Sequence, residues 1–130
     1  MRFLCDEMLA GLGRWLRAAG YDTGKAERGE HDRVLVALAE REGRVFLTRD
    51  RSIERISTTG AVWMLPRGGL EAEARELTAR GVDWRHAPFT RCLADNTPLV
   101  PAGPDEIARM PRGSRELPGP HRSCPDCGRV

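Results

Sequence analysis

Two sets of side chains in this sequence could bind metal ions, and the first is a set of aspartates. Asp6 and Asp50 each follow an apolar run, and Asp32 precedes a segment of helical periodicity. Carboxylate oxygens suit Mg²⁺ or Mn²⁺, and a metal held in this way can orient a water and neutralise charge on a phosphodiester. Each aspartate also has a structural alternative, because aspartate is a favoured helix N-cap.

The second set consists of cysteines near the C-terminal end. Cys124 and Cys127 are separated by two residues and followed by Gly128, a spacing that chelates one Zn²⁺ and permits a tight turn. Cys92 is the expected third ligand. A redox role is disfavoured because the pair lies in a segment rich in proline and glycine rather than between a strand and a helix. Cys5 lies within an apolar run and is expected to be a small buried residue.

The fourth zinc ligand has three candidates. Asp95 stands three positions after Cys92, the same offset that separates Cys124 from Cys127, and it is the preferred choice. His121 and a water molecule are the alternatives. Four protein ligands would make the site structural, whereas an open position would be needed for zinc catalysis.

Four arginines are candidates for phosphate contacts, because the guanidinium presents a planar fork of donors. Arg14 and Arg17 share the segment after the first aspartate, while Arg49 and Arg51 flank the last one. The alternative is a solvated helix face or ion pairs with acids. The net charge of +2 does not indicate nucleic-acid binding by itself, and an overall bias towards Arg, Ala, Gly and Leu also explains the arginine excess. Trp15 is expected to pack against a sheet, with stacking on a base as the alternative.

Strands and helices alternate in the part of the chain that must position these residues. Strands are predicted at 2–5, 21–24, 45–48 and 61–65, and helices at 9–19, 32–42, 52–56 and 70–80. Such alternation predicts a parallel sheet covered by helices on both faces. Asp6 and Asp50 would then lie beyond the carboxyl ends of strands, where functional groups gather, and Asp32 could reach the same rim.

The chain changes character near residue 88. Seven of the nine prolines and three of the four cysteines lie beyond it, and one short helix is predicted at 105–110. So few apolar residues need a metal to hold them together. We therefore expect a sheet domain at 1–87 and a zinc-binding tail at 88–130. No apolar run approaches the roughly 20 residues that span a bilayer, so we expect a cytoplasmic protein with reduced thiols and no membrane anchor.

These motifs resemble the Mut7-C domain family. The resemblance is carried by residues 3–9, 12–17, 20–23, 32–39 and 43–50, and by Cys92 with Asn96, Cys124 and Cys127 in the tail. It implies a PIN-like (Rossmann-like) fold with a C-terminal zinc ribbon. It further implies that Asp6, Asp32 and Asp50 bind metal, with Thr48 beside the last. The family has a cysteine at the position of Asp95, and it usually continues past the last cysteine. The chain is therefore either naturally shorter or a piece of a longer protein.

The function expected from the residues and the resemblance together is that of a ribonuclease. It would hydrolyse RNA phosphodiester bonds with Mg²⁺ or Mn²⁺ at the aspartates and would carry a structural Zn²⁺. Two alternatives remain open: an RNA-binding or protein-interaction module without catalysis, and a different metal-dependent phosphohydrolase on a Rossmann-like sheet.

Overall fold

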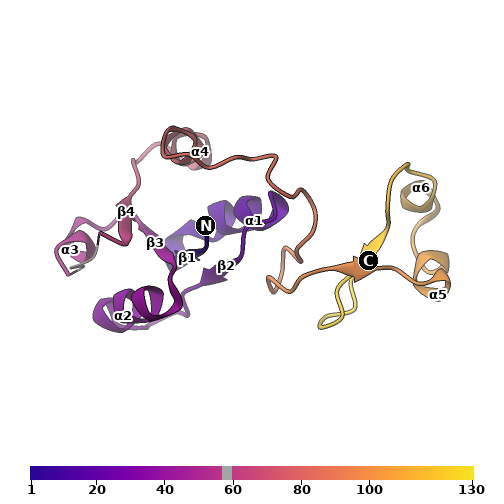
Figure 1. The fold of residues 1–130 in the computed structure, drawn as a ribbon, viewed down its shortest axis with the longest axis horizontal. Coiled ribbons are helices and arrows are strands. Elements are labelled where there is room, and N and C mark those ends of the chain that lie inside the picture. Colours follow the sequence, from indigo (N-terminus) through magenta and orange to yellow (C-terminus); the bar gives the residue numbers. More distant parts are fainter. Residues whose placement is uncertain (57–59) are drawn as a thin grey trace.

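A four-stranded parallel sheet forms the centre of the N-terminal part of the protein, among α1 to α4 (Figure 1). The structure, a computed structural model, describes residues 1–56 and 60–130. The strands are β1 (Phe3–Cys5), β2 (Thr23–Lys25), β3 (Val45–Thr48) and β4 (Val62–Met64), and their order in the sheet is β2-β1-β3-β4. This confirms the expected α/β class with a parallel sheet flanked by helices.

Helices cover both faces of this sheet. A 3-10 turn, η1 (Glu7–Leu9), leads into α1 (Ala10–Ala18), and α2 (Asp32–Glu42), α3 (Arg51–Glu54) and α4 (Leu70–Ala79) follow. Gly43 ends α2 in the left-handed conformation with φ of 66°, which favours glycine. Within the described residues, no helix is both long enough and apolar enough to cross a membrane.

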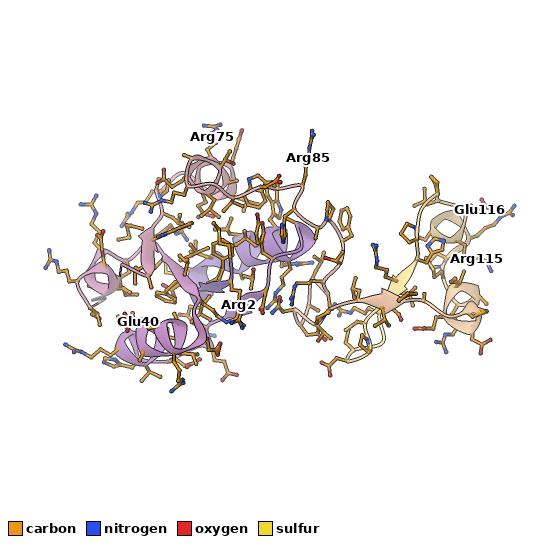
Figure 2. All side chains as sticks on the ribbon, in the orientation of Figure 1. Arg2, Glu40, Arg75, Arg85, Arg115 and Glu116 are labelled. Carbon is orange, nitrogen blue, oxygen red and sulfur yellow. The ribbon has the colours of Figure 1, made fainter. Side chains whose placement is uncertain are left out.

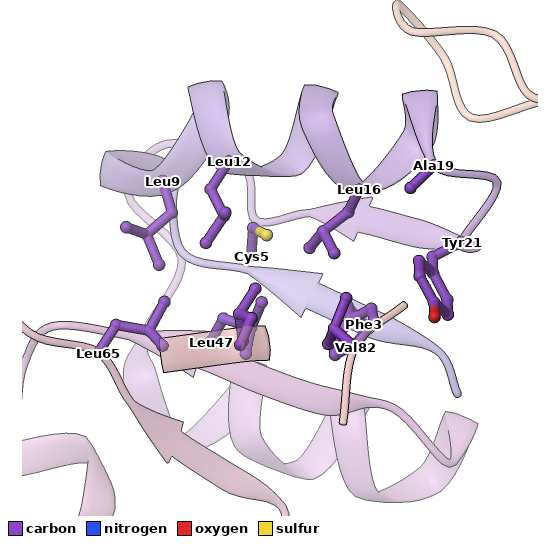
Figure 3. Packing of buried hydrophobic residues seen from close by; sticks show 11 residues of the cluster. Phe3, Cys5, Leu9, Leu12, Leu16, Ala19, Tyr21, Leu47, Leu65 and Val82 are labelled. Carbon is purple, nitrogen blue, oxygen red and sulfur yellow. The ribbon is translucent and has the colours of Figure 1, made fainter. Parts of the chain in front are cut away.

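Successive side chains of each strand point to opposite faces of the sheet, and this divides the core into two clusters. Phe3 and Cys5 of β1 lie in the cluster under α1 and α4, which Figure 3 shows closely, whereas Leu4 lies in the cluster under α2 and α3. Phe46 of β3 is likewise in the second cluster and Leu47 in the first. The period of two therefore buries both faces of the sheet, as a parallel sheet requires.

Some strands and helices begin at other residues than the sequence predicts. The second strand starts at Thr23 rather than at residue 21, because the Tyr21 N–H donates to the carbonyl of Leu16 at the end of α1. In the tail, α5 (Pro104–Ala108) begins one residue early, with its proline at the first helical position. The sequence did not predict α6 (Arg112–Arg115) or the antiparallel pair β5 (Val100–Pro101) and β6 (Arg122–Ser123).

The tail lies beside the sheet, past the ends of α1 and β2 (Figure 1). The N–H groups of Ala87 and Phe89 donate to the carbonyls of Ala19 and Ala18, at the end of α1. At Gly20, which has φ of 96°, a Cβ would lie 2.2 Å from the Ala87 oxygen. This close approach requires glycine.

Candidate functional site

Two tight turns in the tail have the same backbone geometry. In the first knuckle (residues 92–96), the Asn96 N–H donates to the Cys92 carbonyl at 2.9 Å, and in the second knuckle (residues 124–128) the Gly128 N–H donates to the Cys124 carbonyl at 2.9 Å. Asn96 has φ of 71° and Gly128 has φ of 76°, so both turns end in the left-handed region. Asparagine tolerates this region better than most residues, which explains how it replaces glycine in the first knuckle.

The two knuckles bring four candidate ligands together. One ligand atom from each of Cys92, Asp95, Cys124 and Cys127 lies within 4.8 Å of the others. The sulfurs of Cys92 and Cys127 are 3.7 Å apart, and a carboxylate oxygen of Asp95 is 3.4 Å from the Cys124 sulfur. Thiolates bound to tetrahedral Zn²⁺ at about 2.3 Å would be separated by about 3.8 Å. The residues present therefore fit a zinc ion.

The fourth member of this group is Asp95. Its carboxylate accepts a hydrogen bond from the Thr97 N–H at 2.9 Å, which holds the pKa of Asp95 well below its usual range and keeps the group ionised. His121 is not part of the group. The cysteine cluster could thus form a zinc site with three sulfurs and one oxygen.

The first knuckle is attached to the sheet by two side chains. Arg17 of α1 is buried, and its guanidinium donates to the carbonyl of Thr23 at 2.9 Å and to those of Leu93 and Ala94 at 3.0 Å each. Asn96 accepts from the Thr23 N–H at 2.9 Å. These contacts hold the knuckle against the edge of the sheet at β2.

Asn96 also donates to Asp22, at the start of β2. The Asp22 carboxylate accepts from the Asn96 amide at 2.7 Å and from Arg44 at 2.8 Å. Partial burial opposes ionisation of Asp22, but the hydrogen bonds from Arg44 and Asn96 outweigh it and hold its pKa well below the usual range. Asp22 therefore joins the tail to the sheet as a carboxylate.

Three groups meet at the carboxyl ends of β1 and β3. The buried Thr48 hydroxyl donates to the Asp6 carboxylate at 3.0 Å and accepts from the Asp50 N–H at 3.0 Å. Both aspartates are also N-caps: Asp6 accepts from the Glu7 N–H, and Asp50 accepts from the N–H and hydroxyl of Ser52. The bonds from Ser52 lower the pKa of Asp50.

Asp6 and Asp32 line a common acidic pocket of about 330 Å³. Asp32 is the first residue of α2, whose N-cap is His31. The other carboxylates that line this pocket are Glu7, Glu27 and Glu30. Such a set of hard oxygen donors fits Mg²⁺ or Mn²⁺. Within residues 1–56 and 60–130, however, these carboxylates do not converge on one point as the cysteine cluster does.

Asp50 borders a different pocket, of about 1090 Å³, on the side of β4. Arg49 and Arg51 line it too, together with Arg67, which the sequence did not single out. Arg49 is also engaged with the protein, since it donates to the Met8 carbonyl at 3.3 Å and lies 3.7 Å from the buried Glu73. The structure thus places Asp50 beside arginines and apart from the acidic pocket.

The sequence model of the Mut7-C RNAse domain family matches residues 1–130. The chain belongs to the Mut7-C family. A human relative, described as exonuclease mut-7 homolog, is 38% identical to the Mut7-C chain over 55 residues. That match covers 42% of this chain and 6% of the relative, so the chain spans only a small part of that exonuclease's length. No solved structure matches.

The remaining predicted residues of this Mut7-C chain lie on or near α1. Arg14 is exposed, whereas Arg17 is buried in its contacts with backbone carbonyls. The prediction that Trp15 packs against the sheet is wrong: the side chain is half exposed and its ring meets that of Trp84 edge-on at 6.3 Å. Sheet positions on this helix are taken by Leu12 and Leu16 instead.

Sequence analysis missed three carboxylates of the acidic pocket: Glu7, Glu27 and Glu30. Glu27 and Glu30 had a local signal, because together with Asp32 they place three acids within six positions, whereas Glu7 directly follows Asp6. The segment from residue 27 to 32 follows an edge strand, so the sequence alone does not place it near Asp6. Its position emerges only from the parallel pairing of β1 with β2.

Proposed function

We propose that this Mut7-C chain is a divalent-metal-dependent ribonuclease. Membership of an RNAse domain family is the observation that carries the proposal. Asp6 and Asp32 would hold Mg²⁺ or Mn²⁺ in the acidic pocket, with Asp50 as the third acid on the far side of Thr48. Bound there, the ion would lower the pKa of a water and offset charge on the scissile phosphodiester.

The side chains around the pocket have separate roles in this proposal. The Thr48 hydroxyl orients the Asp6 carboxylate by donating a hydrogen bond of 3.0 Å to one of its oxygens. Arg49, Arg51 and Arg67 would contact the phosphates of an RNA strand in the neighbouring pocket. His31 is the N-cap of α2, where its Nδ1 accepts a hydrogen bond from the Arg33 N–H at 3.3 Å.

We further propose that Cys92, Asp95, Cys124 and Cys127 hold a structural Zn²⁺. With four protein ligands, no position would remain for a reacting water. Its role would be to fold residues 88–130, which have few buried apolar side chains of their own. None of the four cysteines forms a disulfide, so the three thiols of the cluster are available as ligands.

One observation favours a second candidate function, an RNA-binding or protein-interaction module without turnover. Asp6 and Asp50 are both used as N-caps, and they line different pockets. A site of this kind would bind RNA through its arginines without cleaving it.

A cleavage assay separates the two functions. Purified protein is incubated with end-labelled RNA and Mn²⁺ or Mg²⁺, and Asp6→Asn and Asp32→Asn are compared with the wild type. The substitution removes a charged ligand at nearly constant shape, so each variant should lose at least tenfold in rate if the carboxylate binds the ion. Asp105→Asn, on exposed α5 of the tail, is the matched control and should cleave normally.

One result would decide against the ribonuclease, and another against its assigned site. Wild-type protein that binds RNA without cleaving it under any divalent ion supports the binding module. Folded Asp6→Asn that cleaves at the wild-type rate refutes the assignment of the acidic pocket.

A further inference from the structure

We propose that a pocket between α1, β2 and the two knuckles binds a phosphate group of RNA. This cationic pocket has a volume of about 390 Å³ and is lined by Arg14, Arg17, Lys25 and Arg129. The inference rests on the proposed function insofar as RNA is the ligand. It adds a binding site that lies outside the acidic pocket and outside the arginines near Asp50.

The charges of this pocket all have one sign. Its other lining residues are Cys5, Ala10, Gly13, Gly24, Leu93 and Ala94, so no carboxylate is among them. A concave surface lined by cations alone focuses a positive potential, which attracts a polyanion.

Three of the four cations are available for a ligand. Among the described residues, the side chains of Arg14, Lys25 and Arg129 have no hydrogen bond or ion pair, unlike the arginines paired with acids on α4 and α6. Arg14 and Lys25 are exposed. Such unpaired cations repel one another at close range, and a bound phosphate would relieve the repulsion.

The pocket has walls from both parts of the chain. Gly13 and Gly24 come from the sheet part and have no side chain to obstruct it, whereas Leu93 and Ala94 belong to the first knuckle and Arg129 follows the second. Arg17 fixes the knuckle wall by donating to the carbonyls of Leu93 and Ala94. The pocket therefore depends on the docked tail.

A third pocket shares lining residues with both this pocket and the acidic one. Lys25 also lines a neighbouring pocket of about 680 Å³, which it shares with Glu7 and Glu27. Those two glutamates in turn line the acidic pocket. One strand of RNA could thus lie along the carboxyl ends of β1 and β2, with a phosphate held by cations at one end and a phosphodiester beside the carboxylates at the other.

The test compares two double variants of the full chain, with zinc present and no added Mg²⁺ or Mn²⁺. Arg14→Ala/Lys25→Ala removes two unpaired cations from the pocket. Arg75→Ala/Arg85→Ala is the control, since it removes the same charge from the α4 side, where Figure 2 labels both residues and neither lines the pocket. Binding of short single-stranded RNA is measured by fluorescence anisotropy between 50 and 200 mM salt, roughly the range in which phosphate contacts are lost.

We expect the pocket variant to bind at least tenfold more weakly at low salt. Its slope of log affinity against log salt should fall by about 1.4, at about 0.7 for each lost phosphate contact on a single strand. RNA with a 5′-phosphate is compared with RNA with a 5′-hydroxyl. A difference between them that disappears in the variant assigns the pocket to a terminal phosphate, and equal loss assigns it to the backbone.

Inorganic phosphate provides a readout that does not need RNA. Titration should shift the amide resonances of Gly13, Gly24, Leu93 and Ala94 in wild-type protein and leave them unmoved in the pocket variant. If the two double variants bind RNA equally and phosphate shifts none of these amides, the proposal is wrong. Cleavage is measured separately. If the protein binds RNA through the pocket but never cleaves it, only the ribonuclease proposal is contradicted. If the protein cleaves RNA and the pocket variant binds RNA as well as the control variant does, only the pocket proposal is contradicted.

Discussion

Substitution of Arg17 should detach the tail from the sheet. The guanidinium makes three hydrogen bonds to backbone carbonyls, and two of these reach across to Leu93 and Ala94 from the same nitrogen. A hydrogen bond from a charged donor contributes about 1.5–3 kcal/mol. Because two of the three bonds share one nitrogen, the three together contribute about as much as two separate bonds. Burial offsets part of this gain, since it disfavours the charged form and lowers the pKa of Arg17.

We therefore expect Arg17→Met to lower the free energy of unfolding by about 3 kcal/mol, which is a large part of the stability of a typical domain. Methionine keeps most of the buried aliphatic volume, so the loss reports the hydrogen bonds rather than the packing. Urea unfolding followed by tryptophan fluorescence measures the global effect. Hydrogen exchange by mass spectrometry measures the local one, and residues 92–97 should exchange faster while β1 and β3 stay protected.

Arg14→Met is the matched control for this experiment. It removes the same charge from the same helix, but the side chain is exposed and the described residues give it no hydrogen bond, so stability should change by less than about 0.5 kcal/mol. If Arg17→Met is as stable as this control and residues 92–97 keep their protection, Arg17 does not hold the tail.

Three further predictions follow from the polar contacts. Thr48→Val should cost about 1–3 kcal/mol in urea unfolding, because the Asp50 N–H loses its acceptor, and it should slow RNA cleavage by releasing Asp6; unchanged cleavage would show that the hydroxyl does not orient that carboxylate. Asp95→Cys should tighten zinc in competition with a chromogenic chelator and Asp95→Ala should weaken it, since sulfur suits zinc better than a hard oxygen does; equal affinities would exclude Asp95 as a ligand. Asp22→Asn should cost about 2 kcal/mol at pH 7 through its lost charged contacts. The pKa of Asp22 is depressed in the folded state, so the loss of stability caused by Asp22→Asn should be fully present above about pH 4 and should shrink as the pH falls below that value. Urea unfolding of both proteins at pH 7 and below about pH 4 measures this change.

Sequence patterns predicted the sheet because its determinants are local. The runs that form β1 and β3 are short, apolar and followed by aspartate, and Gly43 marks the end of α2. Boundaries were less accurate, since the Tyr21 N–H bonds back to α1 and delays β2. The offset of three between Cys92 and Asp95 also singled out the carboxylate that the structure brings into the cysteine cluster.

Contacts between distant segments could not be predicted in this way. Arg17 finds its acceptors 76 and 77 positions later in the chain, and the only local sign of its burial is its place beside Leu16 on the covered face of α1. The separation of Asp50 from the acidic pocket has a similar origin, because the pocket that Asp50 lines is formed with Met64 and Leu65, which the pairing of β3 with β4 brings beside it. Contacts of this kind depend on which groups the folded sheet brings close together.

The docked knuckle also determines what the outer edge of the sheet offers to other chains. Strand β2 is the first in the sheet order, so one side of its backbone faces away from β1. On that side the Thr23 N–H bonds to Asn96, and the Thr23 carbonyl bonds to Arg17. An open strand edge is a template for pairing with another chain, and side chains that occupy its donors and acceptors remove that template. The docked tail therefore protects β2 against edge-to-edge aggregation. Release of the tail would expose a strand edge that can pair with a second molecule.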